Sequence, residues 1–98
     1  MKNVLYNLKL GAREYRLKQG LSIDIFELEV KPHDYSLRTI GHIYRELSSD
    51  TDKDCYYDYV PYLFYTDSDD IKAAYDVKAM KKAVMFLEKH PELQTFPN

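Results

Sequence analysis

Cys55 and three histidines are the residues of this chain that could carry out nucleophilic chemistry. A cysteine thiolate attacks a substrate when a nearby imidazole takes its proton. His33, His42 and His90 are widely separated in sequence, however, and no motif around Cys55 fixes which of them would serve as the base. A structural or incidental cysteine is the simpler interpretation, so we expect no enzymatic activity.

A metal-binding loop is the second kind of chemistry that the chain suggests. The segment DTDKD at 50–54 has the D-x-D-x-D spacing that opens an EF-hand calcium loop. The glycine required at the sixth position is replaced by Cys55, and the glutamate at the twelfth by Pro61. A single cysteine also supplies too few thiolates for a cysteine-based zinc site. We therefore expect no metal or other cofactor and interpret the segment as a solvated acidic loop.

The most unusual part of the sequence combines acid with tyrosine. Residues 48–70 contain seven aspartates and a single lysine, although the whole chain has a net charge of only −2. Five of the ten tyrosines lie in the same segment. Side chains alternate between the two faces of a strand, so these tyrosines cannot all be buried. Either Tyr57 and Tyr59 face outward while Tyr56 and Tyr62 face the core, or the reverse holds.

Exposed tyrosines surrounded by aspartates indicate a protein-binding surface. A tyrosine ring is large and stiff, so it loses little entropy when it docks, and the aspartates create a field that attracts basic partners. The predicted contact residues are Asp50, Asp52, Asp54, Tyr57, Asp58 and Tyr59. The alternative is a solvated loop that leads into a tyrosine-rich edge strand.

The kind of partner follows from charge. Proteins that handle nucleic acids are commonly basic, and small acidic proteins that block them include phage anti-CRISPR proteins, anti-restriction proteins and nuclease immunity proteins. The likeness is one of charge and size, because no motif of those families is present. We expect a small acidic interaction module, such as an inhibitor of a basic nucleic-acid-handling protein.

Nucleic-acid binding is the alternative function. Lys9, Arg16 and Lys18 fall on one face of the predicted sheet, where they could contact phosphates while tyrosines elsewhere stack on bases. They equally suit the solvated side of a hairpin, and the net negative charge opposes phosphate binding. We expect a nucleic-acid partner less than a protein partner.

The elements that position these residues begin with a hairpin. The segment NVLYNLKL alternates apolar and polar residues, and Gly11-Ala12 is a two-residue loop typical of a type II′ turn. The apolar sets of both strands then share one face. The expected pairs are Leu10 with Arg13, Leu8 with Tyr15, Tyr6 with Leu17, Lys9 with Glu14, Asn7 with Arg16 and Leu5 with Lys18.

Three further strands and a helix follow. The predicted strands are residues 3–10, 13–18, 21–30, 36–46 and 55–66, and the predicted helix is 68–90. The apolar pattern changes parity near 25–26, which a bulge or burial of both faces would explain. Residues 36–47 fit a helix or a strand, and we choose strand because Gly41 weakens a helix interior.

Proline and helix signals define the last two elements. Pro61 places the fifth strand at an edge or at a bulge. Ser68 or Asp67 can cap the helix, and Thr66 with Asp69 resembles a capping box. The apolar stripe of the helix is predicted to be Ala73, Val77, Met80, Val84 and Leu87.

These elements predict one α+β domain over residues 1–98. A four- or five-stranded antiparallel sheet carries a C-terminal amphipathic helix on one face, and its other face stays open. An open face or a free edge would also allow a homodimer. No apolar stretch is long enough to cross a membrane, and a lone free cysteine suits a reducing compartment, so we expect a cytoplasmic protein.

Overall fold

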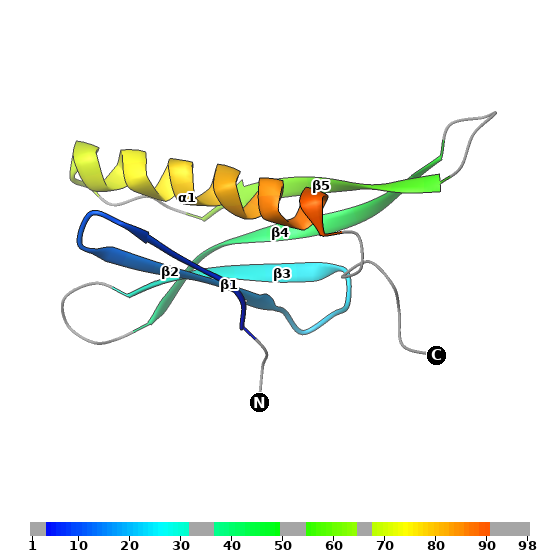
Figure 1. Ribbon diagram of the computed structural model, residues 1–98, viewed down its shortest axis with the longest axis horizontal. Helices are drawn as coiled ribbons and strands as arrows, with labels where there is room; N and C mark the ends of the chain where they lie inside the picture. Colours follow the sequence, from blue (N-terminus) through cyan, green and yellow to red (C-terminus); the bar gives the residue numbers. More distant parts are fainter. Residues whose placement is uncertain (1–3, 32–36, 50–54, 65–67, 91–98) are drawn as a thin grey trace.

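A five-stranded antiparallel sheet and one helix make up the protein, as the sequence predicts (Figure 1). The computed structural model describes residues 4–31, 37–49, 55–64 and 68–90. The elements are β1 (Val4–Leu10), β2 (Arg13–Gln19), β3 (Ile25–Lys31), β4 (Arg38–Ser49), β5 (Cys55–Leu63) and α1 (Asp70–Lys89).

The strands lie side by side in the order in which they occur along the chain, so β1 and β5 are the two edges. α1 packs on one face of the sheet and contacts β4 and both edge strands. We call the opposite face the open face. The β4–β5 hairpin continues past the end of α1 and lengthens the molecule, which measures 48 × 29 × 20 Å (Figure 1).

The β1–β2 hairpin has the predicted register for five of its six expected pairs, from Leu10–Arg13 to Tyr6–Leu17. Gly11 has a φ of 59°, which the first position of a type II′ turn requires and which glycine adopts without strain. The sixth pair is wrong, because a register shift between Val4 and Tyr6 places Val4 opposite Lys18.

β3 begins four residues later than predicted. The segment 21–24 forms a turn between β2 and β3, and the strand starts at Ile25. The parity conflict near 25–26 disappears, because Ile23 belongs to the turn and is exposed. No register shift occurs there in the β2–β3 pair; the shift in β3 lies between Leu28 and Glu29, where β3 pairs with β4.

β4 confirms another prediction. The segment predicted at 36–46 is a strand rather than a helix, and it extends to Ser49. Gly41 faces α1, and a Cβ there would lie 2.5 Å from the Tyr62 carbonyl oxygen and 2.7 Å from the Met80 methyl group. A residue without a side chain therefore allows Met80 of α1 to approach the sheet closely.

β5 is an edge strand, and Pro61 fits its outer side. The Phe64 N–H donates to the Ile40 carbonyl at 2.8 Å. Along an antiparallel strand the N–H groups point alternately toward the neighbouring strand and away from it. Tyr62 therefore directs its N–H toward β4, and Pro61 occupies a position that faces away from the sheet, where no donor is needed.

α1 confirms the predicted helix but not its cap or its whole stripe. Asp69 is the N-cap residue, and its carboxylate accepts from the N–H groups of Ile71 and Lys72. The buried residues are Asp76, Ala79, Met80, Ala83 and Leu87. Val77 is 39% exposed, and Ala73 and Val84 are only half-buried. The buried stripe is thus rotated toward Asp76, a charged residue that the apolar pattern leaves out.

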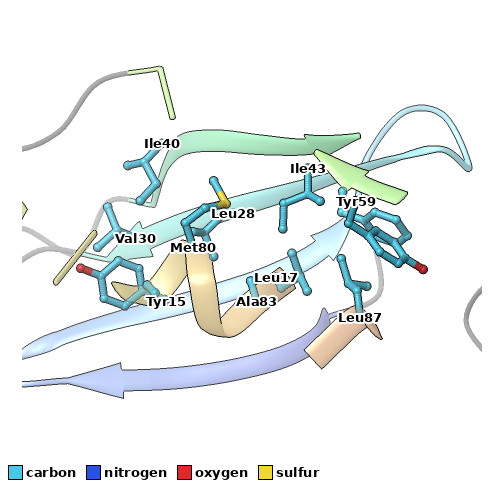
Figure 2. Packing of buried hydrophobic residues seen from close by; sticks show 12 residues of the cluster. Tyr15, Leu17, Leu28, Val30, Ile40, Ile43, Tyr59, Met80, Ala83 and Leu87 are labelled. Carbon is cyan, nitrogen blue, oxygen red and sulfur yellow. The ribbon is translucent and has the colours of Figure 1, made fainter. Parts of the chain in front are cut away.

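The core lies between α1 and the sheet. Figure 2 shows Met80, Ala83 and Leu87 of the helix among side chains of the sheet. Complete burial of one such leucine or isoleucine contributes about 1.5–3 kcal/mol. The sheet residues of the core are Tyr15, Leu17, Phe26, Leu28, Val30, Ile40, Ile43 and Tyr59.

Candidate functional site

The predicted acidic contact residues are only partly described by the structure. Asp50, Asp52 and Asp54 lie outside the described residues. Tyr57 lies in β5 opposite Leu47, and its side chain is also outside the described part of the chain. Asp58 is exposed, and its role in binding stays a prediction.

Tyr59 corrects the predicted contact surface. Its side chain is only 9% exposed, and its ring centroid lies 6.1 Å from that of Phe26 in the core. Alternation along β5 allows two phases, and the observed one turns Tyr59 toward α1 and Tyr62 toward the open face. For Tyr59 and Tyr62 the second of the two predicted arrangements is therefore correct, and Tyr62 rather than Tyr59 is available to a partner.

An aromatic patch lies on the open face of β4 and β5. We define it as Tyr44, Val60, Tyr62 and Phe64, all exposed large apolar side chains, with Tyr62 the most exposed at 59%. His42 joins them: its ring meets Phe64 edge-on at 4.7 Å and Tyr44 at 5.9 Å. Three half-exposed rings present on the order of 300 Å² of surface, an area that in monomers often marks an interaction site.

Two carboxylates border this patch. Glu46 of β4 and Asp58 of β5 stand directly opposite each other in the register, and both are exposed. We call them the acidic pair. Like charges directly opposite each other on neighbouring strands destabilise a sheet. A cation from outside the molecule would relieve this repulsion, so the acidic pair favours a basic ligand beside the aromatic patch.

The three predicted basic residues share the open face with the aromatic patch, but acids accompany them. Lys9 stands opposite Glu14, and Arg16 lies between Asn7 and Glu29. Lys18 forms an ion pair with Glu29, with 2.6 Å between Nζ and Oε2. The face therefore carries alternating charges instead of a continuous cationic surface.

A buried charged cluster beneath α1 was not predicted. The Asp76 carboxylate oxygen Oδ1 accepts from the Tyr15 hydroxyl at 2.6 Å and from Arg13 Nη2 at 3.0 Å, and Arg13 Nε donates to the Tyr15 oxygen at 3.0 Å. All three residues are buried. Burial, and next the hydrogen bond to Asp76, raise the pKa of the Tyr15 hydroxyl above its usual value.

The sequence contains a signal for this cluster. Asp76 precedes Met80, Ala83 and Leu87 at spacings of four, three and four, so it continues the buried stripe. Arg13 pairs with Leu10 on the apolar face of the hairpin. Two opposite charges on two faces that pack together indicate a buried ion pair. The cluster is enclosed, so we assign it to stability and not to ligand binding.

The candidate catalytic residues are not brought together by the described part of the molecule. Cys55 pairs with Ser49 at the start of β5, and its side chain, like His33, is not among those described. His42 lies in the open face, and His90 caps the C-terminus of α1. Within the described ranges, no three His, Cys, Asp or Glu side chains are placed to hold a metal ion.

Two further findings concern the chain as a whole. Among the described residues, no helix has the length and apolar character needed to cross a membrane. Comparisons with protein-family models, with curated proteins and with solved structures give no significant match. The function must therefore be inferred from the surface of the molecule.

Proposed function

We propose that the protein is a small interaction module that binds a basic protein through the aromatic patch and the acidic pair. The observation that carries the proposal is the exposure of four large apolar side chains together on the open face, beside two opposed carboxylates. Aromatic anchors surrounded by charged groups are the usual composition of a protein interface. The proposed activity is binding and not catalysis.

The patch suits rapid and specific association. The ring of Tyr62 in β5 and that of Phe64, just past the end of β5, lie 5.9 Å apart, and the hydrogen bond from the Phe64 N–H to the Ile40 carbonyl holds this segment in place before a partner arrives. Asp58 and Glu46 add negative charge at one end of the patch. Such a field increases the association rate of a basic partner and decreases with salt.

Charge also narrows the class of partner. Cationic surfaces are typical of proteins that bind nucleic acids, because those surfaces neutralise phosphates. A small acidic protein that covers such a surface acts as an inhibitor, in the manner of anti-CRISPR, anti-restriction and nuclease immunity proteins. We propose this inhibitory role within the cytoplasm, where the single free cysteine stays reduced.

Affinity capture with matched variants tests the proposal. The wild-type protein, a Tyr62→Ser/Phe64→Ser variant and an Ile71→Ser/Met85→Ser variant are used as baits in nuclease-treated lysate of the organism that encodes the chain. The control pair removes comparably exposed apolar side chains from α1. We expect a basic protein to be retained by the wild type and the control, and to be lost by the patch variant.

The captured protein then allows the charge contribution to be measured. A Glu46→Lys/Asp58→Lys variant should associate at least about tenfold more slowly at low salt, because the steering field is reversed. Equal retention by the patch variant and the wild type would overturn the proposal. A charge variant with an unchanged association rate would remove the acidic pair from the site.

Single-stranded nucleic acid is a second candidate ligand, and one observation favours it. The exposed rings of the aromatic patch share the open face with Lys9, Arg16 and Lys18, the combination used by sheets that stack bases. Titration of labelled single-stranded DNA and RNA at increasing salt tests it. Binding that weakens steeply with salt and with Arg16→Glu would support this function, and no binding at low salt would exclude it.

A further inference from the structure

The turn between β2 and β3 exposes two aliphatic side chains. We call residues 20–24 the β2–β3 turn. Leu21 is 92% exposed and Ile23 is 51% exposed, although both are large and apolar. Exposed apolar side chains on a flexible loop would not indicate a binding site. What they indicate here therefore depends on whether the turn is held in one conformation.

The turn is fixed by hydrogen bonds at its base. The Gly20 N–H donates to the Ile25 carbonyl at 2.7 Å, and the Ile25 N–H donates to the Ser22 carbonyl at 3.1 Å. The Gln19 side-chain amide donates to the same two carbonyls, at 2.7 Å to Ser22 and 3.1 Å to Ile25. Backbone and side chain together define one conformation of the turn.

Arg45 attaches the turn to β4. Its backbone N–H donates to the Asp24 carbonyl at 2.8 Å, and its Nε and Nη2 both lie 3.2 Å from Asp24 Oδ1. The Arg45 side chain is only 1% exposed. A buried guanidinium with fixed partners is a rigid support, because its displacement would leave a charge unpaired in the core.

The β2–β3 turn adjoins the surface proposed above. Ile25, the first residue after the turn, pairs with Tyr44 of the aromatic patch, and Arg45 immediately precedes Glu46 of the acidic pair. Asp24 is half exposed and forms an ion pair with Arg45. The turn therefore adjoins the aromatic patch through Ile25 and Tyr44, while its Asp24 carboxylate is bound by Arg45, whose buried side chain lies on the other face of β4 from Tyr44 and Glu46.

We infer that the β2–β3 turn is a second anchor for the same basic partner, and that Leu21 enters an apolar pocket on it. The inference rests on the proposed function. A rigid turn loses little conformational entropy on docking, so the burial of Leu21 adds to affinity almost undiminished. The exposed carboxylate of Glu46, which shares the open face of β4 with Tyr44, favours a partner with cationic side chains near this pocket.

Photo-crosslinking locates the partner relative to each anchor. Three full-length proteins carry p-benzoylphenylalanine in place of Leu21, Tyr62 or Ile71, and each is irradiated in nuclease-treated lysate. Ile71 is the control because it is 66% exposed on α1. We expect positions 21 and 62 to crosslink to the same basic protein, and position 71 to give no such product.

The crosslinked protein, once purified, supplies the affinity measurement. Leu21→Ser should weaken its binding about tenfold or more, the loss expected when a buried leucine is removed, and Ile71→Ser should leave it unchanged. Leu21→Ser should also unfold at the wild-type denaturant concentration, because the side chain contacts almost nothing in the free protein. An altered affinity then reflects the interface and not the fold.

The outcomes separate this inference from the proposed function. Crosslinking at position 62 without crosslinking at position 21, or to a different protein, overturns the second anchor and leaves the aromatic patch in place. Absence of crosslinking at both positions overturns both proposals. Unchanged affinity of Leu21→Ser for the protein crosslinked at position 62 also overturns the second anchor.

Discussion

At the scale of single residues, Asp76 is the charge on which the packing of α1 depends. Its side chain is fully buried and accepts hydrogen bonds from Tyr15 and Arg13 of β2. A buried carboxylate is tolerated only when it is paired, and loss of one member leaves the other charge uncompensated. The three residues thus connect a strand near one edge of the sheet to the helix.

Replacement of Asp76 tests this role. Asp76→Ala leaves the Arg13 guanidinium buried without its carboxylate, so we expect a loss of about 3–5 kcal/mol in the free energy of unfolding. Urea denaturation measures it. Glu88→Ala, an exposed position on the same helix, is the control and should change stability by less than about 0.5 kcal/mol. A loss below about 1 kcal/mol for Asp76→Ala would contradict the assignment.

The raised pKa of Tyr15 predicts a response to alkaline pH. An unfolded tyrosine loses its proton above about pH 10, whereas the folded Tyr15 keeps it to higher pH. The unfolded state then binds fewer protons, so stability falls by up to about 1.4 kcal/mol per pH unit above pH 10. Below pH 10 this contribution is fully present and independent of pH.

Comparison with Tyr15→Phe isolates this effect from the other tyrosines. Urea denaturation of both proteins between pH 8 and 11.5 should show a steeper decline above pH 10 for the wild type. Tyr15→Phe should be less stable at pH 8, because Asp76 loses a hydrogen bond. Parallel curves for the two proteins would show that Tyr15 titrates normally.

At the scale of elements, local sequence patterns predict well which strands and helices exist, but they predict poorly the residues at which these elements begin and end. The alternation of β1 and β2 with a glycine turn predicts the register of five pairs, because each signal is local. The N-cap of α1 is less certain from sequence, since Asp67, Ser68 and Asp69 are all suitable residues. The structure selects Asp69 through its two hydrogen bonds.

Alanine substitution distinguishes the cap from its neighbour. Asp69→Ala removes the acceptor for two N–H groups of α1 and should reduce stability by about 1 kcal/mol. Ser68→Ala should change it by less than about 0.5 kcal/mol, because the Ser68 side chain is exposed outside the helix. Thermal unfolding followed by circular dichroism compares them. A larger loss for Ser68→Ala would return the cap to the residue first suggested by the sequence.

Two features of the proposed binding surface escaped sequence analysis for physical reasons. The segment 21–24 has residues typical of a strand, but Arg45, distant in sequence, holds it as a turn through Asp24. Tyr59 and Tyr62 are equally suited to either face, and alternation alone does not select the phase. Tertiary contacts determine both the turn at 21–24 and the face to which each tyrosine points. Both outcomes change which residues are exposed to a partner.

At the scale of the whole molecule, the two edge strands of the sheet differ, because β5 contains a proline and β1 does not. β1 and β5 both contact α1, so the helix spans the core face from edge to edge. The outer side of β5 is interrupted by Pro61, which cannot donate a hydrogen bond to an added strand. The sequence indicated the edge through this proline, and we expect the proline to disfavour a dimer in which a strand is added to β5.

Substitution of Pro61 should open this edge. Pro61→Val restores an outward N–H and a residue that favours strands, so two β5 edges can pair antiparallel. We expect dimers or larger assemblies whose fraction rises with concentration, measured by size-exclusion chromatography with light scattering. Val60→Ala keeps the proline and should behave as the wild type does. A Pro61→Val protein with the wild-type mass at all concentrations would show that Pro61 does not protect the edge.

The position of α1 after all five strands also has a consequence for synthesis of the chain. The ribosome completes β5 26 residues before it completes α1, an interval of on the order of 1–5 s at ordinary elongation rates. During that time the apolar face that Met80, Ala83 and Leu87 will cover has no cover from its own chain. Until α1 is translated, the nascent sheet therefore exposes its apolar face to other proteins, including chaperones.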